Sequence, residues 1–271
     1  MKSPRAQTLF SGTLFVLISL LVLGCGTTDN GKSTAFPYQF NQELLDQKPI
    51  KKVIFASSSF GVPTKSYLIK GERKVKSLAR EYLKDNGFTI LPDYHFQNAW
   101  KQATRNFGDA YDPTTGKINM NTWRQLMTST AEKLRNDTKA DAIIFVDVIE
   151  VTIQHSPNLQ HLARWDGVIR KPTTQGIGAG VPVDFEWAQP IKGASVQTAM
   201  FTMDLQRIFS SRGGIEPLQA VDLRHSEPAY VRKKKPLRSD SFIEEGIQLA
   251  FHPLIEMDNY PGLPAAATST K

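Results

Sequence analysis

The run from Asp141 to Ile153 constrains the fold more than any other part of the sequence. It reads Asp-Ala-Ile-Ile-Phe-Val-Asp-Val-Ile-Glu-Val-Thr-Ile, and its many β-branched side chains favour a strand. The run is longer than an interior strand of a parallel sheet needs to be. We therefore predict a central strand whose far end projects beyond the sheet as a hairpin arm.

The chain before this run alternates between strand and helix patterns. Residues 51–56 and 88–91 are short apolar runs that predict buried strands. Gly87 and Gly108 stand where two helices would end, and Asn121 could cap a third helix. These three helices are predicted from apolar side chains at helical spacing, namely Val75, Leu78, Ala79, Tyr82 and Leu83, then Phe96, Ala99, Trp100, Ala103 and Phe107, then Trp123, Leu126, Met127, Thr130 and Leu134.

The second half of the chain is expected to be mainly antiparallel. Residues 162–170 are the expected return partner of the arm, and residues 195–210 alternate as a third long strand. A turn at 211–214 would then lead to a strand at 218–224 that pairs with the third long strand. Ser241 and Glu244 fit a capping box for a last helix that runs to about Met257, with a kink near Pro253.

This order of elements predicts the α/β class. We expect a three-layer-like sandwich of a mixed sheet with crossover helices, followed by a long antiparallel meander and a C-terminal helix.

Cys25 is the only cysteine, and it follows Val-Leu-Gly at the end of an apolar stretch. Lys2, Arg5, the apolar stretch and the small residue Gly24 form the three parts of a secretory signal. The Val-Leu-Gly-Cys run resembles the lipobox of bacterial lipoproteins. That resemblance implies cleavage before Cys25, a diacylglyceryl group on its sulfur and acylation of the new amino terminus. An ordinary signal peptide with a chance cysteine, or an uncleaved membrane anchor, are the alternatives.

The same pattern divides the chain. We expect a lipoprotein signal peptide at 1–24, a flexible tether at 25–48, a single α/β periplasmic domain at 49–258 and a disordered tail at 259–271. Removal of the signal takes away two positive charges and lowers the formal net charge from +7 to +5. This mild excess is compatible with anionic lipid head groups or acidic cell-wall polymer and does not indicate nucleic acid. Gly26 follows the cysteine, whereas aspartate there commonly retains lipoproteins in the inner membrane, so we expect the periplasmic face of the outer membrane.

The element order also resembles one loose group of envelope lipoprotein domains. The opening Lys-Lys-Val-Ile-Phe-Ala-Ser strand, the middle Ala-Asp-Ala-Ile-Ile-Phe-Val-Asp-Val strand and the late Thr-Ala-Met-Phe-Thr-Met-Asp-Leu-Gln strand carry the resemblance, over residues 50–257. The group includes the curli secretion lipoprotein, the lipoprotein activators of penicillin-binding proteins and the amino-terminal domain of the Tol propeller protein. The resemblance implies a non-catalytic scaffold that binds other envelope components.

Residues with catalytic or metal-binding potential are scattered. The five histidines show no HExxH or related zinc spacing, although His155 and His161 could converge at the end of the arm. Asp147 and Glu150 would lie on opposite faces of a regular strand. We read three further groups as loop or turn residues and not as sites, namely Ser57, Ser58 and Ser59, then Asp109 and Asp112, then Gly176, Gly178 and Gly180. We therefore expect no catalytic residue, no cofactor and no metal.

Two groups of residues are candidates for a partner surface. Trp165 lies between Arg164 and Arg170, and an aromatic side chain among arginines is typical of an interface. The alternative is a tryptophan packed against the last helix, with Asp166 and Gly167 forming a bulge. The second group is the densest basic cluster, in which Lys233, Lys234 and Lys235 stand between Arg232 and Arg238. It either contacts an anionic partner or is only solvated.

Together these features favour a membrane-anchored envelope lipoprotein that acts as a binding or assembly module. Its expected partner is an envelope protein or the cell wall, and homo-oligomerisation stays open. A cell-wall polymer hydrolase or transferase and an oligomeric export component are the alternative functions.

Overall fold

The computed structural model describes residues 35–60, 64–112, 114–155, 159–177 and 180–262. Cys25 and the predicted signal peptide lie outside these residues, as do residues 263–271 of the predicted tail. The helices and strands are β1 (Gln39–Phe40), α1 (Gln42–Gln47), β2 (Lys52–Phe55), the 3₁₀-helix η1 (Ser66–Leu68), α2 (Ile69–Asp85), β3 (Thr89–Leu91), α3 (Tyr94–Phe107), α4 (Met120–Asp137), β4 (Ala142–His155), β5 (Ala163–Trp165), β6 (Val168–Arg170), β7 (Thr174–Gln175), β8 (Ile191–Thr202), β9 (Arg207–Pro217), β10 (Gln219–Asp222), β11 (Ala229–Arg232) and α5 (Asp240–Phe251).

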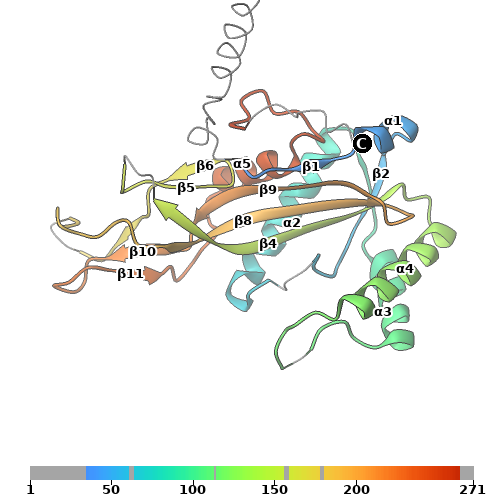
Figure 1. The fold of residues 1–271 in the computed structure, drawn as a ribbon, viewed down its shortest axis with the longest axis horizontal. Helices are drawn as coiled ribbons and strands as arrows, with labels where there is room; N and C mark the ends of the chain where they lie inside the picture. Colours follow the sequence, from blue (N-terminus) through green and yellow to red (C-terminus); the bar gives the residue numbers. More distant parts are fainter. Residues whose placement is uncertain (1–34, 61–63, 113, 156–158, 178–179, 263–271) are drawn as a thin grey trace, which may run out of the picture. The chain divides into compact units, whose positions relative to one another are not determined.

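The long strand predicted from the sequence is the centre of the main sheet. This sheet has the order β1-β9-β8-β4-β2-β3, and Figure 1 shows β4, β8 and β9 running side by side. Strand β2 is parallel to β3 and β4, whereas β8 is antiparallel to both β4 and β9. The α/β class, the antiparallel run and the C-terminal helix are therefore confirmed.

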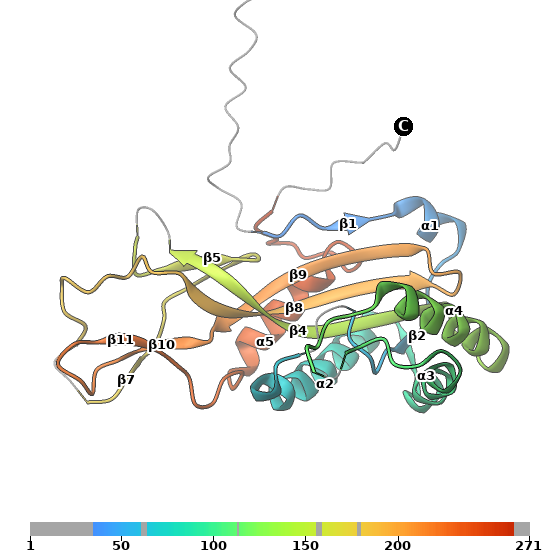
Figure 2. The ribbon, with the colours of Figure 1, turned by 60° about the horizontal axis from the view of Figure 1, so that its bottom comes forward.

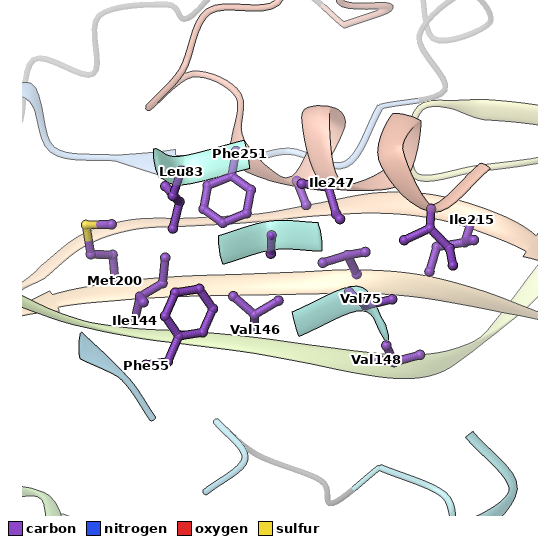
Figure 3. Close-up of a cluster of buried hydrophobic side chains, with 14 of the residues drawn as sticks. Phe55, Val75, Leu83, Ile144, Val146, Val148, Met200, Ile215, Ile247 and Phe251 are labelled. Atoms are coloured by element: carbon purple, nitrogen blue, oxygen red, sulfur yellow. The ribbon is translucent and has the colours of Figure 1, made fainter. Parts of the chain in front are cut away.

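Alternate side chains of β4 enter two different hydrophobic clusters. Ile144 and Val146 pack with side chains of α2 and α5, including Val75 and Phe251 (Figure 3). Ile143 and Phe145 point the other way and pack with side chains of α3 and α4. Since successive side chains of a strand point to opposite faces, helices cover both faces of the β4 region.

The antiparallel run differs from the prediction in where it turns. The residues expected to form one strand at 195–210 make a hairpin of β8 and β9, and its turn contains Leu205 with a φ of 59°. Gly213 and Gly214, the predicted turn, lie inside β9. A Cβ on Gly213 would lie 2.0 Å from the Gly246 carbonyl oxygen. Gly213 therefore permits close approach of α5 to the sheet. Gly214, where a Cβ would lie 2.4 Å from the Val168 side chain, permits close approach of the β5-β6 hairpin. Turn rules cannot show either contact.

The remaining predicted strands pair differently as well. Strand β10 belongs to a separate three-stranded sheet with β11 and β7, and not to β8. Strand β5 pairs with the end of β4 at only two positions before the chain folds back as β6. Asp166 and Gly167 make that turn with φ values of 37° and 87°, as a two-residue type I′ hairpin requires. The return partner predicted at 162–170 is thus itself a small hairpin.

Two helix caps also differ from the predicted residues. Asn119, and not Asn121, caps α4, because its side chain accepts hydrogen bonds from the amides of Asn121 and Thr122. Ser239, and not Ser241, caps α5, which ends at Phe251 and does not continue to Met257.

Residues 35–48 belong to the folded domain and are not part of a flexible tether. Strand β1 pairs with Phe209 and Ser210 of β9, and the amide of Asn41 donates to the Ile208 carbonyl at 2.8 Å. Phe40 and Leu44 pack against the main hydrophobic cluster. The folded domain therefore begins earlier than the boundary predicted at residue 49.

Within the part of the chain that the structure describes, no helix is both long and apolar enough to cross a membrane.

Candidate functional site: a basic surface beside helix α2

Two basic segments that are far apart in the sequence meet at the start of α2. A Cβ on Gly71 would lie 2.2 Å from the Leu237 side chain, so the loop after β11 lies against the first turns of α2. The Lys74 ammonium donates to the Arg238 carbonyl oxygen at 3.2 Å and pairs with Asp240. The Arg232 guanidinium stacks over the Tyr67 ring at 4.4 Å. We call the exposed cations gathered here the basic surface, which consists of Lys65, Lys70, Arg73, Arg232, Lys234, Lys235 and Arg238.

Lys233 holds the loop in place and is not part of this surface. Its ammonium lies 2.7 Å from the Glu216 carboxylate, and both side chains are largely buried, with 13% and 10% of their area exposed. Glu216 also accepts a hydrogen bond from the Leu237 amide. Of the three predicted lysines, Lys234 and Lys235 are exposed and Lys233 is directed inward.

The cations of the basic surface are not neutralised within the domain. Among the described residues, none of the seven forms an ion pair with a carboxylate. Ile69 lies beside them with 40% of its surface exposed. Clustered, unpaired positive charges create a field that attracts anions to this side of the molecule.

Trp165 does not contribute to a partner surface. It is only 7% exposed, it packs with Ile153, Ile191 and Leu249 of α5, and its indole N–H donates to the Ala194 carbonyl at 3.3 Å. The sequence-based surface assignment is therefore wrong, and the packed alternative describes this side chain correctly. The reason is that the β5-β6 hairpin folds back toward α5, which buries the ring.

The arginines beside Trp165 are also partly buried. Arg170 pairs with Glu245 of α5 at 2.5 Å and stacks on the Phe242 ring at 4.2 Å. Arg164 is half-buried on β5. Arg170 therefore connects the hairpin to α5.

Asp147 carries a buried carboxyl group, and its burial was not predicted from the sequence. It is 1% exposed, and its Oδ2 accepts a hydrogen bond from the Phe60 amide at 2.7 Å, while its Oδ1 has no partner among the described residues. Burial raises the pKa of Asp147 to about 6. Glu150 instead accepts a hydrogen bond from the Tyr67 hydroxyl. The two carboxylates therefore do not share a site. The burial of Asp147 could have been predicted from its place inside an apolar strand.

The serine loop after β2 lies next to Asp147. The Ser59 carbonyl accepts a hydrogen bond from the Tyr111 hydroxyl at 2.9 Å, and the buried Ser58 hydroxyl has no partner among the described residues. The negative charge of Asp147 and burial together raise the pKa of Tyr111 to about 12, with burial the larger cause. This is a compact polar cluster under a loop, and Ser57 is its only exposed serine.

The other sequence candidates do not converge on a site. The Nε2 atom of His155 lies 3.1 Å from the Tyr230 hydroxyl, and His161 contacts the Trp187 ring. Because the Tyr230 hydroxyl donates to the Trp187 carbonyl at 3.2 Å, the two histidines adjoin one aromatic cluster, which offers no metal site among the described residues. Asp112 accepts hydrogen bonds from the Thr114 and Thr115 amides, which lower its pKa and mark an ordinary turn. Over the described residues, no group of three or more His, Cys, Asp or Glu side chains could hold a metal ion. Gly178 lies outside the described residues.

No protein-family model matches this chain, and neither a curated protein nor a solved structure is significantly similar to it.

Proposed function

We propose that this chain is a bacterial envelope lipoprotein, anchored by lipid on Cys25 at the periplasmic face of the outer membrane. Its domain acts as a non-catalytic binding or assembly module for another envelope component. The observation that carries the proposal is the Val-Leu-Gly-Cys run behind a short apolar stretch with a basic start. Several acyl chains on one cysteine would anchor the domain nearly permanently, because each buried methylene contributes about 0.8 kcal/mol.

The folded domain is consistent with this role. The described part of the domain begins at Ala35, ten residues after Cys25. We further propose that the helices on the two faces of β4 make a three-layer sandwich, with crossover connections between the parallel strands β2, β3 and β4. Such a rigid body offers a surface to a partner, and no bond needs to be made or broken.

Replacement of Cys25 tests the proposal directly. We expect Cys25→Ala to abolish incorporation of radiolabelled palmitate and to release the protein from the membrane fraction of expressing cells. Cys25→Ser serves as a second variant that retains a small polar side chain. Palmitate incorporation that survives in both variants would refute lipidation at this residue.

A further inference from the structure

We propose that the basic surface binds an extended polyanion, that is, a polymer chain that carries phosphate or carboxylate groups. The inference rests on the proposed function for its setting in the cell envelope. It goes beyond that function by naming the surface and the chemical class of the partner.

The first step is the supply of unpaired charge. Lys70 and Arg73 lie at the start of α2 and Lys65 lies just before η1, whereas Lys234, Lys235 and Arg238 come from the loop after β11. The buried Lys233–Glu216 pair and the stacking of Arg232 on Tyr67 fix that loop next to the helix. The fold therefore brings cations from two distant segments onto one surface. A charge run that is only solvated would need no second segment beside it.

The second step concerns the kind of partner. Interfaces between folded proteins have an apolar, often aromatic centre, but Ile69 is the one large apolar side chain at least 36% exposed among the described residues of α2 and the 232–238 loop. Long, exposed lysines and arginines suit repeated weak contacts with many anionic groups. A linear polymer provides such contacts without a shaped pocket.

The third step concerns the position of the surface in the domain. Figure 2 shows β1 beside β9 at one edge of the main sheet, whereas α2 lies alongside β4. Strands β9 and β8 separate β1 from β4 in the sheet. The first described residues therefore leave the seven cations exposed.

The test compares two variants that lose the same charge. One is Lys70→Gln, Arg73→Gln, Lys234→Gln and Lys235→Gln, and the matched control is Lys101→Gln, Arg105→Gln, Lys117→Gln and Lys139→Gln, whose side chains are exposed elsewhere. Full-length protein in non-ionic detergent is titrated with fluorescent linear polyphosphate and with fluorescent polyglutamate. We expect the basic-surface variant to bind at least one of these polymers roughly tenfold more weakly than the control variant, with a loss that shrinks as salt rises.

Three outcomes would overturn the inference. These are equal affinity of the two variants for both polymers, no polymer binding by the wild-type protein at low salt, and tighter wild-type binding to phosphatidylglycerol vesicles than to either polymer. Equal melting temperatures of the two variants would show that both are folded. Failure of palmitate labelling would refute the lipid anchor of the proposed function, but it would leave the comparison of polymer affinities unaffected.

Discussion

At the scale of single residues, Asp147 makes the clearest prediction about stability. Its pKa in the folded chain is about 6, above the ordinary value of 3.8, because burial disfavours the charged form. The fold therefore binds this proton more tightly than the unfolded chain does. The stabilisation is complete below about pH 4 and is lost as the pH rises through 6.

We expect Asp147→Asn to stabilise the protein at pH 8 and to leave it nearly unchanged at pH 4. The gain at pH 8 is at most about 3 kcal/mol, which is the free energy that corresponds to the pKa difference. The variant retains the hydrogen bond from the Phe60 amide, because an asparagine side chain can still accept it. Urea unfolding at the two pH values measures it. Tyr111, Lys76 and Glu72 also act on Asp147 electrostatically. The control for the loss of one negative charge is therefore a residue outside this group, and Glu81→Gln on the exposed side of α2 serves this purpose. An equal gain at both pH values would contradict the role assigned to ionisation.

At the scale of elements, the structure and the sequence prediction differ in which of two asparagines caps α4. Asn119 accepts hydrogen bonds from two first-turn amides at 3.1 and 3.2 Å, whereas the Asn121 side chain reaches only Arg124 at 3.4 Å. We expect Asn119→Ala to lower the free energy of unfolding by about 1 kcal/mol. Asn121→Ala should change it by less than about 0.5 kcal/mol. Urea midpoints of the two variants give the comparison, and the opposite ranking would make Asn121 the cap.

Local patterns predicted most elements but not their partners. The apolar spacing at Val75, Ala79 and Leu83 marks the buried side of α2 correctly, because burial of that side depends on sequence distance along one helix. Gly213 and Gly214 look like a turn by composition, yet a Cβ would meet Gly246 at the first position and Val168 at the second, and both partners are distant in sequence. No local rule contains those contacts.

The candidate site shows the same limit. The charge run identified Lys234 and Lys235, but it could not distinguish them from the inward-facing Lys233, whose partner Glu216 precedes it by 17 residues. The contribution of Lys70 and Arg73 required the packing of Leu237 against Gly71. Four of the seven cations of the basic surface were therefore visible in the sequence, and the other three, Lys65, Lys70 and Arg73, depend on tertiary contacts.

At the scale of the whole molecule, the start of the folded domain can be tested by truncation. Strand β1 covers part of the edge of β9 through Gln39 and Phe40, and Phe40 and Leu44 add apolar contacts to the main cluster. An uncovered edge strand is also a site for aggregation. A chain that begins at Pro49 would lose the pairing and these contacts together.

We expect the truncated domain that begins at Pro49 to melt at a lower temperature than one that begins at Ala35, and to aggregate at lower protein concentration. Removal of a fully buried large apolar side chain costs about 2–5 kcal/mol. Phe40 and Leu44 are only partly buried, so each should contribute less than that, and the total loss adds these contributions to the loss of strand pairing. Thermal unfolding and light scattering of the two domains provide the measurement. Phe40→Ala in the longer domain separates packing from strand pairing, since it removes the ring and leaves the backbone pairing in place. Equal melting temperatures for the two domains would show that residues 35–48 add no stability and belong to the tether. The tether between the lipid anchor and the folded domain would then be longer by that segment.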